Sequence, residues 1–168
     1  MTRSAAILGL GERGKRWVTL FQTAGWKVRG FDPDPLAGTV GVPEDGWQKM
    51  DTISAATHGA DWVMLCLPDR LELAQMVIQR AQAEAPETSL VGVCSDTFEI
   101  DDVQNCSIRP GRVVVLRGRP QSGVDLLVSS RNDDALRVNA IAVLSEFGDD
   151  VLRVDDAKVQ QLRDFRSA

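Results

Sequence analysis

Residues 5–14 read AAILGLGERG, in which a short apolar run is followed by three glycines with the spacing GxGxxG. We predict a buried strand over Ala5–Leu8, because a brief apolar run ending in a glycine turn is typical of a parallel-sheet strand. Lys27–Phe31 predicts a second strand, which Asp32 follows. The stretch between them indicates a helix that stops at Gly25, since apolar residues recur there at helical spacing: Trp17, Leu20, Phe21 and Ala24. This order of elements makes the glycine turn a candidate dinucleotide site.

The three glycines have separate roles in such a site. Gly9 permits the tight turn, Gly11 lets the backbone approach a pyrophosphate, and Gly14 lets the helix pack on the strand. The N-terminus of the helix offers free N–H groups and a partial positive charge to that anion. Asp32 would accept hydrogen bonds from a ribose diol and repel a 2′-phosphate, which favours NAD over NADP. One alternative is that the site binds FAD instead of NAD. The other is that the glycine turn serves only for packing and that Asp32 is a solvated residue at the end of the strand.

Three other residues of the turn are also expected to contact the cofactor: Leu10, Glu12 and Arg13. Glu12 is unfavourable in this position, because its carboxylate would repel a pyrophosphate. We expect the basic side chain of Arg13 or Lys15 to offset that charge.

The remainder of the chain alternates apolar runs with amphipathic stretches, the pattern of a parallel sheet covered by helices. Residues 33–47 are predicted as a Pro/Gly-rich loop. Asp69 is expected to cap a helix with Leu73, Met76, Val77 and Ala81 on one face, and residues 134–147 and Ala157–Phe165 are expected to be helical. Further strands are predicted at Gln48–Met50, Trp62–Leu67, Leu90–Cys94, Val113–Arg117, Val124–Ser129 and Val151–Val154. The sequence therefore predicts one α/β domain over residues 1–168, doubly wound and Rossmann-like, with a mostly parallel sheet.

Composition excludes several classes of function. The 168 residues carry a net charge of −5, which argues against a nucleic-acid or anionic-membrane partner. The apolar runs fall short of the roughly 18 residues of a membrane span. The three cysteines, Cys66, Cys94 and Cys106, are an odd number without CxxC spacing, so we expect reduced thiols in a cytoplasmic protein and no metal site.

A few polar residues are weaker candidates. His58, the single histidine, cannot build a zinc site alone, so we expect it at the surface or at a helix end. Asp133 and Asp134 are expected to cap a helix. Four arginines either lie at the surface and contribute to solubility or bind a carboxylate or phosphate as an anion clamp: Arg109, Arg112, Arg117 and Arg119. If the strand stays extended through Gly118, Arg117 and Arg119 would share a direction at its ligand-binding end.

Beyond the glycine turn, longer segments carry a family resemblance. AAILGLGERG, GWKVRGFDPDP, ADWVMLCLPDRLELAQMV, CSDTFEIDDVQ and RPGRVVVLRGRP together resemble the NAD-binding domain of L-3-hydroxyacyl-CoA dehydrogenases, particularly the L-carnitine dehydrogenases. The resemblance implies an oxidoreductase of fatty acid metabolism that binds NAD through Gly9, Gly11, Gly14 and Asp32, with Leu67 and Pro68 beside the cofactor.

The resemblance also implies that the family's catalytic residues are missing. The position of its catalytic His holds Arg117, which stays protonated and cannot act as a base. Its orienting Glu would fall near Val128 or Ser129, where no acid stands, and its substrate-binding Ser corresponds to Asp96 or, with a slip of one residue, to Thr97. The family's helical second domain has no counterpart, because the chain ends where that domain would begin.

Two functions follow as alternatives. One is an NAD-dependent oxidoreductase that acts on a small anionic substrate. Its catalytic groups would come from other residues of this chain or from a partner subunit, and the protein could form a homodimer. The other is a non-catalytic NAD(H)-binding module, a sensor or a subunit.

Overall fold

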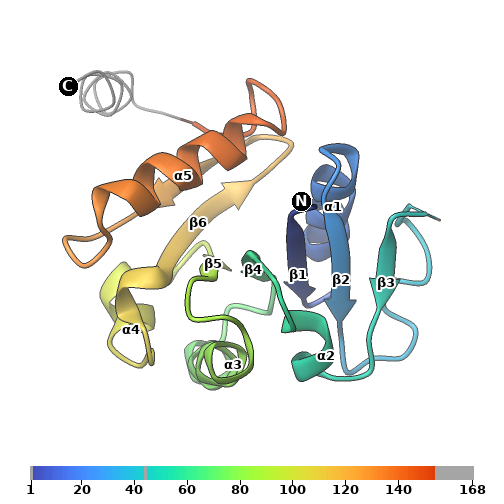
Figure 1. The fold of residues 1–168 in the computed structure, drawn as a ribbon, viewed down its shortest axis with the longest axis horizontal. Coiled ribbons are helices and arrows are strands. Elements are labelled where there is room, and N and C mark those ends of the chain that lie inside the picture. The colour runs from blue at the N-terminus through green and yellow to red at the C-terminus, as the bar shows by residue number, and fades with distance from the viewer. Residues whose placement is uncertain (1, 44, 154–168) are drawn as a thin grey trace.

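The computed structural model describes residues 2–43 and 45–153, which form one seven-stranded sheet flanked by helices (Figure 1). The strands are β1 (Ser4–Leu8), β2 (Lys27–Phe31), β3 (Trp47–Lys49), β4 (Trp62–Leu65), β5 (Leu90–Cys94), β6 (Val113–Arg119) and β7 (Gly123–Leu127). Their order in the sheet is β3-β2-β1-β4-β5-β6-β7. Only β7 is antiparallel to its neighbour, so the predicted mostly parallel, doubly wound α/β sheet is confirmed. The order reverses between β1 and β4, which is where such sheets open a ligand crevice.

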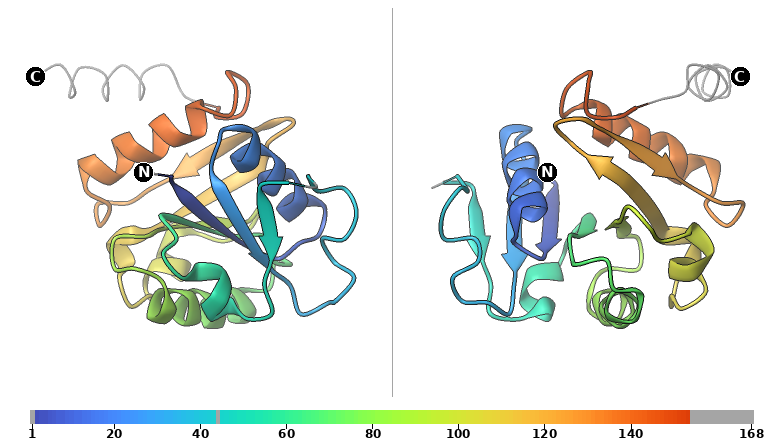
Figure 2. Two further views of the ribbon diagram at one scale, coloured as in Figure 1. Left: turned by 45° about the vertical axis from the view of Figure 1, so that its right-hand side comes forward. Right: turned by 180° about the vertical axis from the view of Figure 1, so that it is seen from behind.

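Helices cover both faces of the sheet. They are α1 (Glu12–Thr23), α2 (Ile53–Thr57), α3 (Leu71–Glu84), α4 (Ile100–Gln104) and α5 (Asp134–Ser145). Figure 1 shows α1 and α5 in its upper part and α2, α3 and α4 in its lower part, and Figure 2 shows the same division from two other sides. Within these described helices, none is long and apolar enough to cross a membrane.

Alternate strand residues enter two separate cores. In β1, Ala5 and Ile7 pack with Trp17 and Phe21 of α1, whereas Ala6 and Leu8 pack on the side of α2 and α3. The central strands are buried on both faces, so their sequences are apolar runs without alternation. Such burial stabilises the domain by about 1.5–3 kcal/mol for each large apolar side chain.

Helix boundaries follow local capping. The carboxylate of Asp133 accepts a hydrogen bond from the Leu136 N–H at 2.7 Å, which confirms the expected cap of α5. The chain leaves α1 through Gly25, whose φ of +88° an L side chain rarely adopts.

Several sequence predictions need correction. The helices α2 and α4 were not predicted, because five residues are too few to show helical periodicity. β4 ends at Leu65 rather than Leu67, and β7 covers Gly123–Leu127 rather than Val124–Ser129. The predicted strand Val151–Val154 is a single bridge from Leu152 to Val124 within the described residues. The helix predicted at Ala157–Phe165 lies outside them.

Candidate functional site

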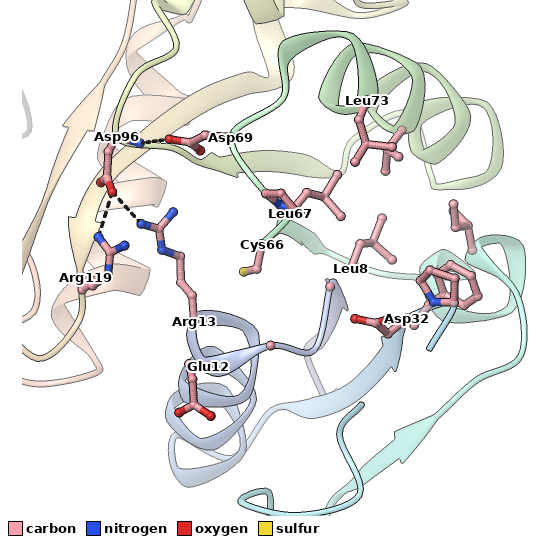
Figure 3. Close-up of a pocket in the computed structure, with 17 residues that line it drawn as sticks. Leu8, Glu12, Arg13, Asp32, Cys66, Leu67, Asp69, Leu73, Asp96 and Arg119 are labelled. Atoms are coloured by element: carbon pink, nitrogen blue, oxygen red, sulfur yellow. Dashed lines mark hydrogen bonds and ion pairs between the residues drawn. The ribbon is translucent and has the colours of Figure 1, made fainter. Parts of the chain in front are cut away.

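An open cavity of about 740 Å³ lies at the carboxyl ends of β1, β2 and β4. Its volume is within the range of small-molecule and cofactor sites. Figure 3 shows Asp32 at one end of the cavity and Asp96 with Arg119 at the other, with Cys66 and Leu67 between them. Its lining residues are Leu8, Gly9, Gly11, Glu12, Arg13, Phe31, Asp32, Pro33, Ile53, Cys66, Leu67, Pro68, Asp69, Leu73, Val77, Asp96 and Arg119.

The glycine turn is packed tightly at two of its glycines and open at the third. Gly9 has a φ of +98°, and a Cβ there would lie 2.4 Å from the Cys66 carbonyl oxygen. A Cβ on Gly14 would lie 1.8 Å from the Gly9 carbonyl oxygen, so only glycine lets α1 approach β1 this closely. Gly11 lines the cavity, and a Cβ there would meet nothing within 4 Å. The backbone at Gly11 therefore leaves room for a ligand.

Two backbone hydrogen bonds fix the carboxylate of Asp32 at the end of β2. The Leu10 N–H donates to Oδ2 at 2.8 Å, and the Asp34 N–H donates to Oδ1 at 2.9 Å. Each carboxylate oxygen can accept two hydrogen bonds, so each keeps one acceptor position for a ligand. The carboxylate is thereby oriented in advance to bind a pair of hydroxyl groups.

The N-terminus of α1 faces the same cavity. Gly11 is its N-cap residue and provides no side-chain cap for the first N–H groups, which gives that end of the helix affinity for an anion. The Glu12 side chain is 95% exposed, and its carboxylate pairs with Lys15 Nζ at 3.0 Å. Lys15, one of the two bases considered, therefore offsets the charge of Glu12.

Arg13 instead takes part in an ion cluster at the far end of the cavity (Figure 3). Its guanidinium donates to Asp96 Oδ2 at 3.0 Å, and the guanidinium of Arg119 donates to the same oxygen at 2.8 Å. The Gly118 N–H reaches Asp96 Oδ1 at 3.2 Å. The hydrogen bond from Arg119 contributes most to lowering the pKa of Asp96, so this carboxylate is a weak base.

Asp69 connects the loops after β4 and β5. Its carboxylate accepts hydrogen bonds from the Asp96 N–H at 3.0 Å and the Thr97 hydroxyl at 3.3 Å. The prediction that Asp69 caps α3 is therefore wrong, because the N-cap residue is Arg70 and no side chain caps that helix. Thr97 binds Asp69 and is not among the residues that line the cavity.

Arg117 and Arg119 diverge, which corrects the expectation of a shared clamp. Gly118 has a φ of +101°, so the regular alternation of the strand is interrupted between them. Arg119 lines the cavity, whereas the guanidinium of Arg117 donates to the Phe98 carbonyl. Arg109 and Arg112 similarly donate to the carbonyls of Gln82 and Thr88, respectively. Three of the four arginines thus bind backbone carbonyls, and Arg119 is the one of the four that lines the cavity.

The remaining candidates are structural in the part of the chain described. Cys66 and Cys94 are buried, with their sulfur atoms 3.8 Å apart. The hydrogen bond with Cys94 and burial raise the pKa of the Cys66 thiol, so this cavity residue is a poor nucleophile. His58 is exposed at the C-terminal end of α2, as expected. No set of three metal-ligating side chains gathers among residues 2–43 and 45–153.

The fold is a Rossmann-like α/β domain with an open cavity at the carboxyl ends of its central strands. No protein-family model matches the chain. Its sequence resembles L-carnitine dehydrogenases: it is 31% identical to the enzyme of Mesorhizobium japonicum over 73% of this chain and 39% of that protein. It is 29% and 32% identical to the L-carnitine dehydrogenase/betainyl-CoA thioesterases of Ruegeria pomeroyi and a Rhizobium species, over 67% and 73% of this chain. The matched region spans only 27% and 28% of those two proteins.

Solved structures show the same fold. One is the dehydrogenase of 5-formyl-3-hydroxy-2-methylpyridine 4-carboxylic acid, an NAD⁺-dependent dismutase, with a TM-score of 0.80 and 18% identity over 92% of this chain and 57% of that one. Another is the 3-hydroxybutyryl-CoA dehydrogenase of Escherichia coli K12, with a TM-score of 0.78 and 15% identity over 88% of this chain and 37% of that one. The predicted resemblance to carnitine and hydroxyacyl-CoA dehydrogenases is confirmed.

Proposed function

We propose that the chain binds NAD(H) in the cavity between Asp32 and the Asp96–Arg119 pair. The observation that carries the proposal is the Asp32 carboxylate, which is fixed by two backbone N–H groups and lies across the same cavity from the uncapped N-terminus of α1. Asp32 would bind the adenosine ribose, and the α1 N-terminus with Gly11 would bind the pyrophosphate.

Apolar side chains support this orientation. Phe31, Pro33 and Ile53 line the cavity with Asp32, which suits an adenine ring. Leu67 and Pro68 line its middle and would lie beside the cofactor at the point where strand order reverses. When bound, NAD would supply hydride transfer, and this chain's residues would position it.

We further propose that the chain, taken alone, is a binding module rather than a complete hydroxyacyl-CoA dehydrogenase. Its single histidine, His58, is not among the cavity residues, and Arg117 donates to a loop carbonyl. Asp96 is a weak base because of Arg119. The three free cysteines, of which Cys66 and Cys94 are buried, support a cytoplasmic location. The alternative is an enzyme completed by a partner subunit or a second copy, and the dehydrogenase names of the relatives favour it.

Calorimetric titration with NAD, NADH, NADP and FAD tests the proposal. We expect NAD(H) to bind more tightly than NADP, since the Asp32 carboxylate repels a 2′-phosphate. Asp32→Asn should weaken NAD binding by about 1–3 kcal/mol, the scale of hydrogen bonds to a charged group. Asp149→Asn is the matched control, because Asp149 is exposed in the loop after α5 and does not line the cavity. Absence of NAD binding at millimolar concentration, or preference for FAD, would contradict the assignment.

A further inference from the structure

The ion cluster of Arg13, Asp96 and Arg119 unites three segments that are far apart in the sequence. Arg13 comes from the first turn of α1, Asp96 from the loop after β5, and Arg119 from the end of β6. All three residues line the cavity at the end opposite Asp32 (Figure 3). In a sheet of this topology, that end is the half of the crevice away from the adenosine ribose, where the reacting part of a dinucleotide and its substrate would meet.

The cluster uses only a small part of the hydrogen-bonding capacity of its arginines. Both guanidinium groups approach one oxygen, Asp96 Oδ2, each through a single nitrogen. A guanidinium has five N–H donors in a planar fork that matches the two oxygens of a carboxylate. Asp96 cannot offer both oxygens to either arginine in this arrangement, because Oδ1 faces the Gly118 N–H. A second carboxylate would therefore find unused donors on both arginines.

The ion pair between Asp96 and Arg119 also costs little to exchange. The side chains of Asp96 and Arg119 are 41% and 50% exposed, and ion pairs at such exposure contribute little to stability. The Arg13 side chain is only 14% exposed, so it is already held in position. Asp69, the other carboxylate at this end, accepts hydrogen bonds from the Asp96 N–H and the Thr97 hydroxyl, which partly offset its charge.

We propose that Arg13 and Arg119 form a binding site for the carboxylate group of a small substrate, and that Asp96 is the internal carboxylate which this ligand displaces. The substrate class is then a small hydroxy or oxo acid rather than a neutral alcohol. The assignment of this ligand as the redox substrate rests on the proposed NAD(H) site, whereas the carboxylate site itself rests only on the ion cluster.

Lactate and its neutral analogue lactamide serve as probes, with inorganic phosphate as a second anion. Binding is measured by ligand-observed NMR on the full chain, with and without NADH, and NADH binding is measured by calorimetry on the same samples. We expect lactate to bind and lactamide to bind at least about tenfold more weakly. Arg119→Gln should weaken lactate binding about tenfold, whereas Arg80→Gln, on an exposed position of α3 away from the cavity, should leave it unchanged.

Asp96→Asn gives the sharpest test, because the sign of its effect depends on the role of Asp96. Removal of an internal competitor should tighten lactate binding by about two- to fivefold. Weaker lactate binding in this variant would overturn the proposal, as would equal binding of lactate and lactamide, or binding of phosphate alone. Lactate binding without NADH binding would refute the NAD(H) site and leave the carboxylate site intact. NADH binding without lactate binding would refute only the carboxylate site.

Discussion

Alanine substitutions at Gly14 and Gly11 separate the stability of the domain from its cofactor binding. We expect the first to destabilise the fold and the second to weaken NAD binding. A glycine-to-alanine change inside a helix ordinarily stabilises a protein by up to about 1 kcal/mol. At Gly14 the added Cβ would lie 1.8 Å from the Gly9 carbonyl oxygen and 2.8 Å from its carbon, and backbone atoms cannot yield as a flexible side chain can. Overpacking of this kind costs about 1–3 kcal/mol or more, so we expect Gly14→Ala to destabilise the domain by about 2 kcal/mol.

The matched variant is Gly11→Ala, whose Cβ meets nothing within 4 Å. Gly11 is an N-cap residue with ordinary negative φ, so this change should cost less than about 1 kcal/mol of stability. Its methyl group would enter the cavity where the pyrophosphate approaches, and NAD binding should fall about tenfold or more. Urea unfolding followed by tryptophan fluorescence, together with calorimetric titration, measures both effects. A Gly14→Ala variant as stable as the parent, or a Gly11→Ala variant that binds NAD normally, would refute this reasoning.

Three other outcomes are expected. The chain alone should turn over 3-hydroxyacyl-CoA and carnitine at least about 10²-fold more slowly than ordinary dehydrogenases, because no histidine is among the described residues that line the cavity and Arg117 donates to a loop carbonyl. Turnover of roughly 1–10³ per second in a spectrophotometric NADH assay would contradict this. Iodoacetamide at pH 8 should label half-buried Cys106 before buried Cys66. Burial raises the pKa of Cys106, but the hydrogen bond with Cys94 together with burial raises the pKa of Cys66 well above its ordinary value, and labelling of Cys66 first in peptide mass spectrometry would contradict this order. The hydrogen bond from Arg3 lowers the pKa of Glu146 in the folded protein. The pair therefore stabilises the fold fully above the ordinary glutamate pKa of about 4.3, and this stabilisation is lost as the pH falls through the lowered pKa. Glu146→Gln should therefore flatten the acid limb of a thermal-unfolding series, and an unchanged limb would exclude this contribution.

Local sequence patterns were sufficient to predict the sheet and the glycine turn. The strand before Gly9, the helix that leaves through Gly25, and the cap at Asp133 each depend on residues within a few positions of one another. The same reasoning placed Gly9, Gly11 and Asp32 together, and all three line the cavity, because the position of Asp32 at the end of β2 follows from the βαβ order. Leu67 and Pro68 were expected there only from the family resemblance.

Contacts between distant segments could not be predicted in this way. Arg13 was predicted as a cofactor-binding residue of the turn and as a countercharge for Glu12, although its carboxylate partner is 83 residues away at Asp96. Asp69 looked like a helix cap from its position before α3, yet the loop after β5 offers it an N–H and a hydroxyl. The divergence of Arg117 and Arg119 depends on the backbone of Gly118, whose positive φ leaves no sign in the sequence beyond the glycine itself.

The two edge strands of the sheet, β7 and β3, differ in how they could pair with a strand of another chain. Beside β7, the Val124 N–H donates to the Val151 carbonyl at 2.7 Å, and the Arg153 N–H donates to the Val124 carbonyl at 2.8 Å. The segment from Val151 to Arg153 therefore pairs with backbone groups of Val124 that could otherwise bind a strand of another chain. At the opposite border, β3 offers only the three residues Trp47–Lys49, directly after a glycine turn. Within residues 2–43 and 45–153, neither border is a long template for strand addition, which limits edge-to-edge association of this sheet with another.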